Sequence, residues 1–328
     1  MSTFSLILCG HNSSIMRPPT AIETMSATPP DLAELRRRLD EIDDKLQDLL
    51  IERAEIISMV AASKRNGNLA AFQPEREAEI IRRLVDRHRG DFPVATLVRM
   101  WREMLAATVQ LQSLFAVAVY APIESQGFWD LARDHYGSNT PMSAYRSIGQ
   151  VIRAVTEGQA SVGVLPMPQE GESDPWWRHL LSKDEDAPRV VARLPFGARG
   201  NARSDGADAL AIGRGAQKET GGDRTLLATE STADISRGRI FRILSSLGLV
   251  CTFFASYEHA GSALNLIELE GFVPISDPRL DSFRMQLGGA LHRLLPFGGY
   301  AVPLPGTALA KSGATRGISF RRGEGLSK

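Results

Sequence analysis

The chain has 328 residues, a length that suits two or three domains. Its 38 basic and 38 acidic residues cancel, so the basic surplus expected of a nucleic-acid-binding or membrane-surface protein is absent. Hydrophobic residues make up 43% of the chain, yet no apolar run approaches the roughly 20 residues that span a bilayer. These totals predict a globular protein that binds neither nucleic acid nor membrane.

Cysteine and histidine are few and scattered along the chain. Cys9 and Cys251 cannot build a disulfide framework, and no CxxC spacing suggests structural zinc. The six histidines form no HExxH or HxH pair, so we expect no metal site. A reducing cytoplasm is the compartment that this cysteine usage favours.

Residues 1–30 are predicted to be a disordered leader, because prolines are interspersed with serine and threonine. The apolar run Phe4–Cys9 lacks a preceding basic region and is too short for a signal peptide. Met25 begins an alternative start directly before the first predicted helix, and the sequence leaves open whether Met1 or Met25 is used.

A long amphipathic helix is predicted from Asp31 to about Asn66. Its apolar residues recur at steps of three and four, with one seven-residue gap, and we call this stripe the seam: Leu32, Leu35, Leu39, Ile42, Leu46, Leu49, Ile56 and Val60. A helix of this length extends about 50 Å, which exceeds the diameter of a small domain. We therefore expect it to pack against a second copy of itself in a homodimer.

Two further helices are predicted, from Pro74 to Arg89 and from Pro93 to Leu114, each with one apolar stripe. Three helices of these lengths cannot bury all their apolar faces alone, which again favours a dimer. The three helices define a first domain, residues 31–114.

After residue 114 the pattern becomes α/β, and the predicted fold class of the whole chain is α + α/β. Residues 115–217 are expected to form one α/β domain, and residues 223–305 follow the order βαββαβ of a ferredoxin-like domain. In the second of these, the predicted helices are Ser236–Leu247 and Pro278–Leu295, and the last strand is Gly299–Leu304. The Gly-rich, basic tail 306–328 is predicted to be disordered.

The first helix carries cations where its seam should be apolar. Arg53 falls on the seam, and Lys64, eleven residues later, lies within about 20° of the same face. Two like charges on one stripe are costly unless they meet an anion, although both could also extend to solvent or pair with glutamates. Arg36 is offset by about 100° from Arg53 and could face another subunit or solvent.

Polar residues on the other two helices also admit two interpretations. The second helix opens at Gln73-Pro74-Glu75-Arg76-Glu77, which is a good capped start with an early proline and acids that suit the helix dipole, but the same charges could belong to a site. On the third helix, Thr108 and Gln112 are four residues apart and share a face, either as a polar edge or as part of a site.

Taken in order, these residues resemble the all-helical class of chorismate mutases over about Asp31 to Ser113. The matching set is Arg36, Arg53, Lys64, Arg76, Glu77, Thr108 and Gln112, at spacings that agree with the family to within about one residue. The resemblance implies an intertwined dimer of three-helix chains that converts chorismate to prephenate without a cofactor or metal. The Claisen rearrangement of this dianion needs its conformer held and negative charge on an ether oxygen stabilised.

The resemblance also implies a role for each residue. Arg53 and Arg36 of the partner subunit would bind substrate carboxylates, and Thr108 would support one of them. Lys64 and Gln112 would donate to the ether oxygen. Arg76 would add positive charge and Glu77 would accept from the ring hydroxyl, while Gln73 stands where family members often have an aspartate.

The segment 115–305 more weakly resembles a prephenate dehydratase domain, which is periplasmic-binding-like in fold, followed by an ACT-like domain. The resemblance is clearest in Ile148–Pro166, a helix and strand. The catalytic signatures are missing: Ala121–Gly127 replaces a Gly-rich loop, Met167–Gly171 replaces Glu-Asn-Ser, and Ala207–Ala209 replaces Thr-Arg-Phe. The phenylalanine-binding motifs of ACT domains are also not recognisable. We therefore expect a degenerate dehydratase domain that serves as scaffold or regulator.

Three functions remain open on the sequence. The first is an active chorismate mutase of phenylalanine and tyrosine biosynthesis with a non-catalytic C-terminal half. The second is a bifunctional chorismate mutase/prephenate dehydratase whose motifs have diverged. The third is a non-catalytic sensor or partner of another aromatic-pathway enzyme. The presence of Arg53, Lys64, Arg76, Glu77 and Gln112 together argues against this third function. Regulation by aromatic amino acids is not decided by the sequence.

Overall fold

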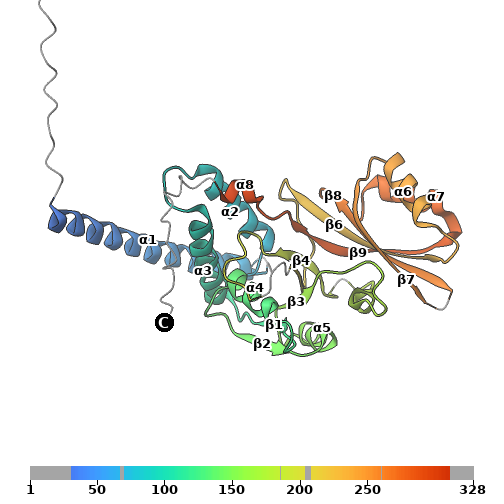
Figure 1. Ribbon diagram of the computed structural model, residues 1–328, viewed down its shortest axis with the longest axis horizontal. Coiled ribbons are helices and arrows are strands. Elements are labelled where there is room, and N and C mark those ends of the chain that lie inside the picture. The colour runs from blue at the N-terminus through green and yellow to red at the C-terminus, as the bar shows by residue number, and fades with distance from the viewer. Residues whose placement is uncertain (1–30, 67–69, 185, 204–207, 260, 311–328) are drawn as a thin grey trace, which may run out of the picture. The chain divides into compact units, whose positions relative to one another are not determined.

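The computed structural model describes residues 31–66, 70–184, 186–203, 208–259 and 261–310 (Figure 1). The chain divides into two compact units, Met1–Arg53 and Ala54–Lys328. The described part of the first unit is the N-terminal portion of helix α1. The predicted leader 1–30 and residues 311–328 lie outside the described residues. No helix in the described ranges is long and apolar enough to cross a membrane.

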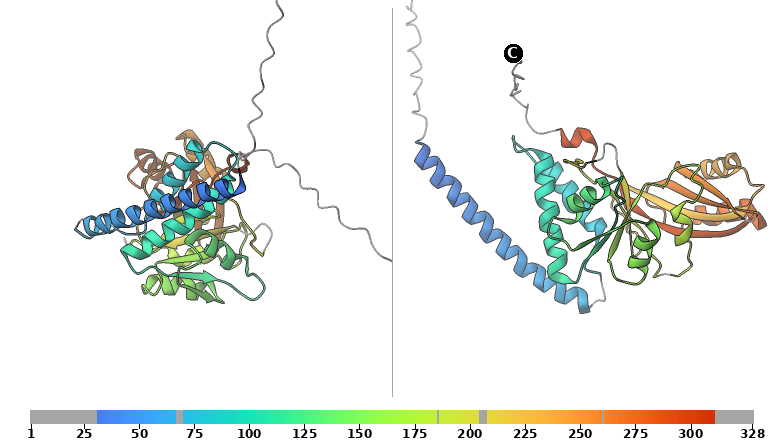
Figure 2. Two further views of the ribbon diagram at one scale, coloured as in Figure 1. Left: turned by 90° about the vertical axis from the view of Figure 1, so that its left-hand side faces the viewer. Right: turned by 60° about the horizontal axis from the view of Figure 1, so that its bottom comes forward.

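The three predicted N-terminal helices are present: α1 (Leu32–Asn66), α2 (Pro74–Arg87) and α3 (Val94–Gln112). α2 begins as expected, with a proline in the first turn and with Glu75 and Glu77 near the positive end of the helix dipole. α3 lies against α4 (Gly127–Tyr136), the first helix of the following part of the chain (Figure 2). The helical segment is therefore joined to the rest of the second unit by packing as well as by the chain.

One nine-stranded sheet runs through the C-terminal half, which we define as residues 115–310, in the order β2-β1-β3-β5-β4-β9-β6-β8-β7. β1 is parallel to β2 and β3, whereas β5 is antiparallel to β3 and β4. The strands of this first section are β1 (Val117–Tyr120), β2 (Met142–Tyr145), β3 (Val162–Pro166), β4 (Arg189–Leu194) and β5 (Ala209–Gly213). Its remaining helical elements are α5 (Ile148–Thr156) and the 3-10 helix η1 (Trp176–Leu180).

The second section of the sheet has the predicted element order βαββαβ. Its strands pair antiparallel in the order β9-β6-β8-β7. These elements are β6 (Asp223–Thr232), α6 (Arg237–Ser246), β7 (Cys251–His259), β8 (Ser262–Glu270), α7 (Pro278–Leu287) and, after the 3-10 turn η2 (Gly288–Ala290), β9 (Leu291–Ala301). The described ranges thus comprise a helical N-terminal part and a mixed α/β C-terminal part.

The last helix and strand differ from the prediction. The helix expected over Pro278–Leu295 ends at Leu287, and the strand expected over Gly299–Leu304 already begins at Leu291. Gly288 has a φ of 59° and ends the helix, as glycine at this position commonly does. Beyond it, residues 291–301 pair with β6, so the ladder rather than the local helical pattern decides their conformation.

The two sections of the sheet meet at a single close approach. β4 and β9 run parallel and pair at Val190 and Gly298. Gly298 has a φ of 97°, and a Cβ atom there would lie 2.1 Å from the carbonyl oxygen of Val190. Only glycine fits this position without displacing backbone, so the continuity of the sheet depends on it.

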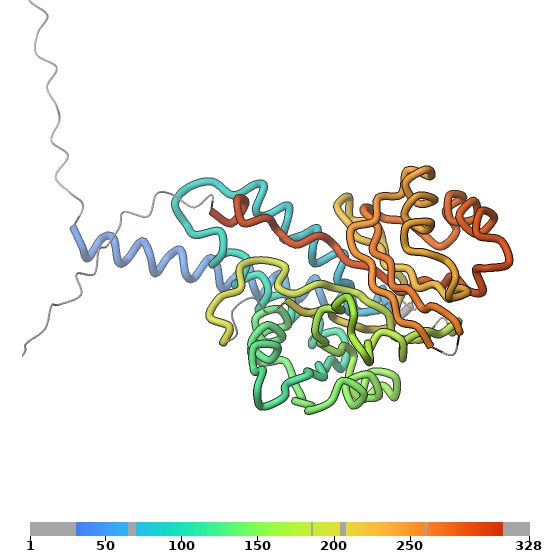
Figure 3. Tube along the Cα trace, turned by 45° about the vertical axis from the view of Figure 1, so that its right-hand side comes forward, coloured from blue at the N-terminus to red at the C-terminus, as the bar shows by residue number. Residues whose placement is uncertain are grey.

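The tail predicted to be disordered from residue 306 is partly ordered. Gly306–Leu309 form the short helix α8, and Ala308 and Leu309 pack against a buried cluster formed by α2 and α3. The chain after β9 runs alongside α2, and the side chain of Arg82 donates to the carbonyl of Val302 over 2.9 Å (Figure 3). Apolar contact with the helices therefore orders the start of this segment.

Two adjacent tryptophans in η1 fill the core between the two sections of the sheet. Trp176 and Trp177 are both buried in the same cluster as residues of β3, β8 and β9. The indole N–H of Trp176 donates to the carbonyl of Pro166 over 3.1 Å. The indole nitrogen of Trp177 has no hydrogen-bond partner among the described residues.

We predict that Trp176→Phe destabilises the fold more than Trp177→Phe. Both changes remove similar buried volume, but the first also removes the hydrogen bond to the Pro166 carbonyl, worth about 0.5–1.5 kcal/mol, whereas the second removes an N–H that has no partner among the described residues. Urea unfolding followed by circular dichroism measures both free energies. Equal losses in the two variants would show that the hydrogen bond to Pro166 contributes nothing.

Candidate functional site

The end of α1 and the start of α2 place Lys64 beside the first turn of α2. The Lys64 ammonium donates to the carbonyl of Ala71 over 3.1 Å, across the connection between the two helices. Next to Ala71, the ring of Phe72 packs on those of Phe115 and Tyr136 at centroid distances of 5.1 and 6.0 Å. These contacts anchor the connection on the C-terminal half. Burial and the nearby Lys218 lower the pKa of Lys64.

Glu77 is the buried carboxylate of the first turn of α2. Its Oε2 accepts from the Nη1 of Arg102 on α3 over 3.0 Å, and both residues are buried. Burial raises the pKa of Glu77, while the charges of Arg102 and Lys64 oppose this shift. The charge of Lys64 at the end of α1 therefore acts on Glu77 in the first turn of α2.

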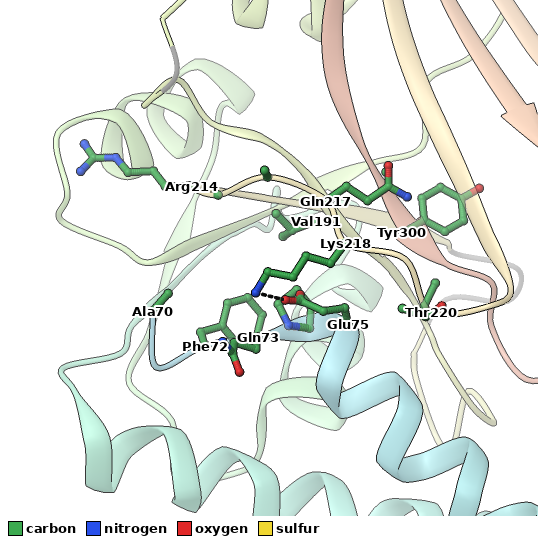
Figure 4. Close-up of a pocket in the computed structure, with 15 residues that line it drawn as sticks. Ala70, Phe72, Gln73, Glu75, Val191, Arg214, Gln217, Lys218, Thr220 and Tyr300 are labelled. Carbon is green, nitrogen blue, oxygen red and sulfur yellow. Dashed lines mark ion pairs between the residues drawn. The ribbon is translucent and has the colours of Figure 1, made fainter. Parts of the chain in front are cut away.

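A cavity of about 340 Å³ borders this region and is lined by both the helical segment and the C-terminal half (Figure 4). Gln73 and Glu75 line it from the start of α2, and Lys218 reaches in from the connection between β5 and β6. The Lys218 ammonium lies 3.1 Å from Oε1 of Glu75. Gln73 makes no side-chain cap at the helix start, so its amide serves the cavity wall rather than the helix.

Arg76 lies apart from Lys64 and Glu77. It is exposed on α2 and pairs with Glu79 over 2.9 Å. Successive helical residues diverge by about 100°, so an inward Glu77 turns Arg76 outward. In a single chain Arg76 can reach the predicted site only by giving up this surface ion pair, which costs little.

Thr108 and Gln112 share one face of α3, as their spacing predicted. The hydroxyl of Thr108 donates to the carbonyl of Met104 over 2.8 Å, and the amide of Gln112 donates to the carbonyl of Thr108 over 3.0 Å. The Oε1 atom of Gln112 is buried without a hydrogen-bond partner in the described ranges. The amide N–H of Gln112 donates to a backbone carbonyl that already accepts a hydrogen bond within the helix. A ligand can therefore take over this N–H without leaving the carbonyl unpaired.

Arg36 and Arg53 belong to the first unit of the chain. Arg36 is exposed on α1. Arg53 is half-buried, and burial lowers the pKa of its guanidinium. A guanidinium remains charged despite such a shift, so Arg53 keeps the charge that carboxylate binding requires.

Sequence reasoning missed both Arg102 and Lys218. The signal for Arg102 was present, because it follows Val98 by four residues and precedes Leu105 by three, inside the buried stripe of α3. The same argument had singled out Arg53 on α1. No comparable signal exists for Lys218, which reaches the cavity only through the fold of the C-terminal half.

The grouped side chains suit one kind of ligand. Lys64 supplies positive charge and Glu77 an acceptor in a poorly solvated setting where electrostatic interactions are strong. An anionic molecule that carries a hydroxyl group fits this set. Among the described residues, no group of three or more histidine, cysteine or acidic side chains is arranged to hold a metal ion.

Comparison with protein families decides the nature of the helical segment, because the chorismate mutase type II family matches residues 35–113. Residues 35–113 are a chorismate mutase domain. This mutase domain comprises nearly all of α1 to α3 and carries each of the residues singled out above except Lys218.

Curated relatives extend the likeness beyond the mutase domain. A bifunctional chorismate mutase/prephenate dehydratase of Aquifex aeolicus is 30% identical over 141 residues, which are 42% of this chain and 39% of the relative. One from Pseudomonas aeruginosa is 32% identical over 149 residues, 43% of this chain and 40% of the relative. The chain thus spans about two fifths of the length of these relatives. A chorismate mutase of Methanocaldococcus jannaschii is 40% identical over 63 residues, 18% of this chain and 64% of the relative.

Solved structures give weaker likenesses. One described as "GqqA- a novel type of quorum quenching acylases" has a TM-score of 0.43 at 15% identity, covering 58% of this chain and 96% of that chain. The prephenate dehydratase from Streptococcus mutans has a TM-score of 0.40 at 19% identity, covering 58% of this chain and 98% of that chain. TM-scores this low do not establish a shared fold.

The buried pair of the mutase domain makes a testable prediction about stability. Arg102→Leu and Glu77→Leu each leave one buried charge uncompensated, and each should lower the free energy of unfolding by about 3–5 kcal/mol. The double variant removes both charges and should lose clearly less than the sum of the two. Urea unfolding of the four proteins measures the coupling, and additive losses would contradict a direct interaction between the two charges.

Proposed function

We propose that this chain catalyses the rearrangement of chorismate to prephenate in the biosynthesis of phenylalanine and tyrosine. The observation that carries the proposal is the convergence of Lys64 and Glu77 at the junction of α1 and α2, inside a segment that matches the chorismate mutase type II family. A sensor that had lost catalysis would have no need to keep a half-buried ammonium beside a buried carboxylate, because both are costly to desolvate.

The chemistry assigns each side chain a task. The rearrangement is intramolecular, so catalysis consists of holding the reactive conformer and stabilising the negative charge that grows on the ether oxygen. Lys64 and Gln112 donate to that oxygen, and Glu77 accepts from the ring hydroxyl. Arg53 binds a carboxylate of the substrate, and Thr108 supports it.

Arg76 and Gln73 complete the proposed binding set. Arg76 adds positive charge when it leaves Glu79 for the substrate. Gln73 stands where members of the chorismate mutase family often carry an aspartate. It faces the hydroxyl side of the site with an amide that donates as well as accepts.

A homodimer is part of the proposal because the described residues of one chain leave the seam of α1 exposed. All eight seam residues, from Leu32 to Val60, are exposed, and several expose more than half of their area, including Leu39 at 59% and Leu46 at 52%. A continuous apolar stripe of this length is covered in stable proteins. A second copy of α1 covers it and brings Arg36 of the partner subunit to the substrate.

We predict that Leu39→Asp with Leu46→Asp yields a monomer. Each change places a charge in the centre of the seam, where its burial against a partner helix is unfavourable. Light scattering coupled to size exclusion measures the mass, and Asp44→Lys, on the opposite face of α1, serves as the control. A parent protein that is already monomeric would contradict the dimer.

The same variant separates assembly from chemistry. If Arg36 of the partner subunit binds substrate, the monomer loses mutase activity together with its dimeric mass. A fully active monomer would remove Arg36 from the proposed site while leaving Lys64 and Glu77 in place.

For the C-terminal half we propose a degenerate prephenate dehydratase domain, periplasmic-binding-like over residues 115–217 and ACT-like over residues 223–305. The βαββαβ element order and the strand order β9-β6-β8-β7 support the ACT-like part. Near the missing threonine motif, Asp208 is held by Arg193 and Arg199 at 2.8 and 2.6 Å, which suits a structural role. A cytoplasmic location follows from the proposed biosynthetic role.

The relatives support a second candidate, the bifunctional chorismate mutase/prephenate dehydratase. Their matches are longer than the mutase domain, so part of the likeness falls outside residues 35–113. Dehydration of prephenate requires an acid near the leaving hydroxyl, and the product distinguishes the two candidates.

The activity is tested by the loss of chorismate absorbance with the purified protein. We expect prephenate as product and a roughly 100- to 1000-fold lower kcat in Lys64→Ala, since one donor to a developing oxyanion is removed. Arg53→Ala should be similarly impaired through loss of a carboxylate contact. Lys183→Ala, an exposed lysine of the C-terminal half, should keep the parent rate.

The product then assigns the C-terminal half. Prephenate that accumulates without acid treatment supports a mutase alone, whereas phenylpyruvate supports the bifunctional enzyme. A parent protein that does not consume chorismate would contradict both enzymes and favour a sensor.

A further inference from the structure

A side chain from the C-terminal half completes the core of the mutase domain. Phe196 follows β4 in the chain, yet it is buried in the cluster formed by α2 and α3, with Ile81, Val98 and Leu105 as neighbours. Its backbone carbonyl accepts from the N–H of Leu304 over 2.8 Å, which ties the residue to the segment after β9. Phe196 is therefore fixed by the C-terminal half while its ring lies between the mutase helices.

The ring of Phe196 supports the guanidinium that holds Glu77. The Cζ atom of Arg102 lies 5.0 Å from the ring centroid, within the range of a cation–π interaction, and its Nη1 donates to Glu77 over 3.0 Å. Arg82 also lies over this ring, at 5.8 Å, but donates to Thr220, Gly222 and Val302 instead. Two arginines thus lie over the same ring, and of these two it is Arg102 that donates to the carboxylate of Glu77.

The other groups around this pair carry little charge. Burial and the charge of Arg102 lower the pKa of His135 on α4, so the imidazole stays neutral. Burial raises the pKa of its neighbour Tyr136, which stays protonated. The charges that act on Glu77 from the elements packed around it are Arg102 on α3, Glu75 on α2 and Lys64 on α1, with the neutral Tyr136 on α4.

We propose that Arg102 is the positioning residue of Glu77 in the mutase reaction, and that the C-terminal half holds Arg102 in place through Phe196. The inference rests on the proposed mutase function and assigns the C-terminal half a part in it. Arg102 fixes Oε2 of Glu77, and the proposal gives Oε1 to the substrate hydroxyl.

The consequence for protonation has a definite sign. Glu77 must be ionised to accept from the hydroxyl in the best orientation, so activity falls as the pH drops through its pKa. Burial already raises the pKa of Glu77, and Arg102 opposes that shift. Weakening the contact with Arg102 raises the pKa of Glu77 further and moves the acid limb of the activity profile to higher pH.

The test is the pH dependence of kcat and kcat/KM with chorismate for the full-length chain. The acid limb is assigned to Glu77 by its disappearance in Glu77→Gln, which accepts a hydrogen bond at every pH. Arg102→Lys keeps the charge but loses the planar fork, and Phe196→Leu keeps an apolar core but loses the ring face. Arg82→Lys is the matched control, because it disturbs the other arginine on the same ring.

We expect Arg102→Lys to lower kcat about 10- to 100-fold and to move the acid limb to higher pH, since loss of a supporting contact misplaces the reacting group. Phe196→Leu should move the limb in the same direction by less. Arg82→Lys should lower the melting temperature and leave the limb in place, because Arg82 donates to Thr220, Gly222 and Val302 and not to Glu77.

Two results would overturn the inference while the mutase stands. Unchanged acid limbs in both Arg102→Lys and Phe196→Leu, with only lower melting temperatures, would make Arg102 a structural residue. An equal shift in Arg82→Lys would show that general loosening of the core, rather than the Arg102 contact, moves the limb. An inactive parent protein, in contrast, would contradict the proposed function itself.

Discussion

A buried carboxylate and a buried guanidinium must pair with each other, because neither charge is solvated by water. Glu77 and Arg102 form such a pair, and their contact constrains the helices that carry them. Neither α2 nor α3 can shift along the other without separating the two charges, which would be costly in a poorly solvated interior. The ring of Phe196 lies against the guanidinium of Arg102. The contact between α2 and α3 is thus made by a buried ion pair whose arginine also lies against a ring from the C-terminal half.

The sheet of the C-terminal half supplies the framework for that contact. β9 pairs with β6 along most of its length and with β4 only at Val190 and Gly298. Past this approach the chain leaves the sheet, contacts Arg82 of α2 at Val302 and then bonds to Phe196 at Leu304. Pairing with β6 along its length and the close approach of Gly298 to β4 together place the segment that follows β9 beside α2.

The sequence predicted features that local pattern determines. The period of the seam predicted α1, the proline and acids at residues 74–77 predicted the start of α2, and an arginine on an apolar stripe drew attention to Arg53. The helix predicted over Pro278–Leu295 was wrong beyond Leu287, because pairing with β6 overrides the local preference of residues 291–295.

The residues around the candidate site likewise differ in whether local sequence pattern or tertiary packing places them. The charge of Lys64 acts on Glu77 because a short connection joins their helices. Lys218 and Phe196 lie far away in sequence and join the region only through tertiary packing, for which a single sequence has no signal. Arg102 had such a signal in its helical spacing, but an isolated arginine on a helix is usually solvated, so the pattern alone did not distinguish it.

The placement of Phe196 bears on how such a fused chain can evolve. A helical segment whose core is filled by its own side chains can be inherited, exchanged or expressed by itself. Here one side of the core between α2 and α3 is a ring that is encoded more than 80 residues after α3 ends. Recombination that separates the two halves would leave a hole where the ring had been, so the fusion is hard to reverse whether or not the downstream half carries chemistry of its own.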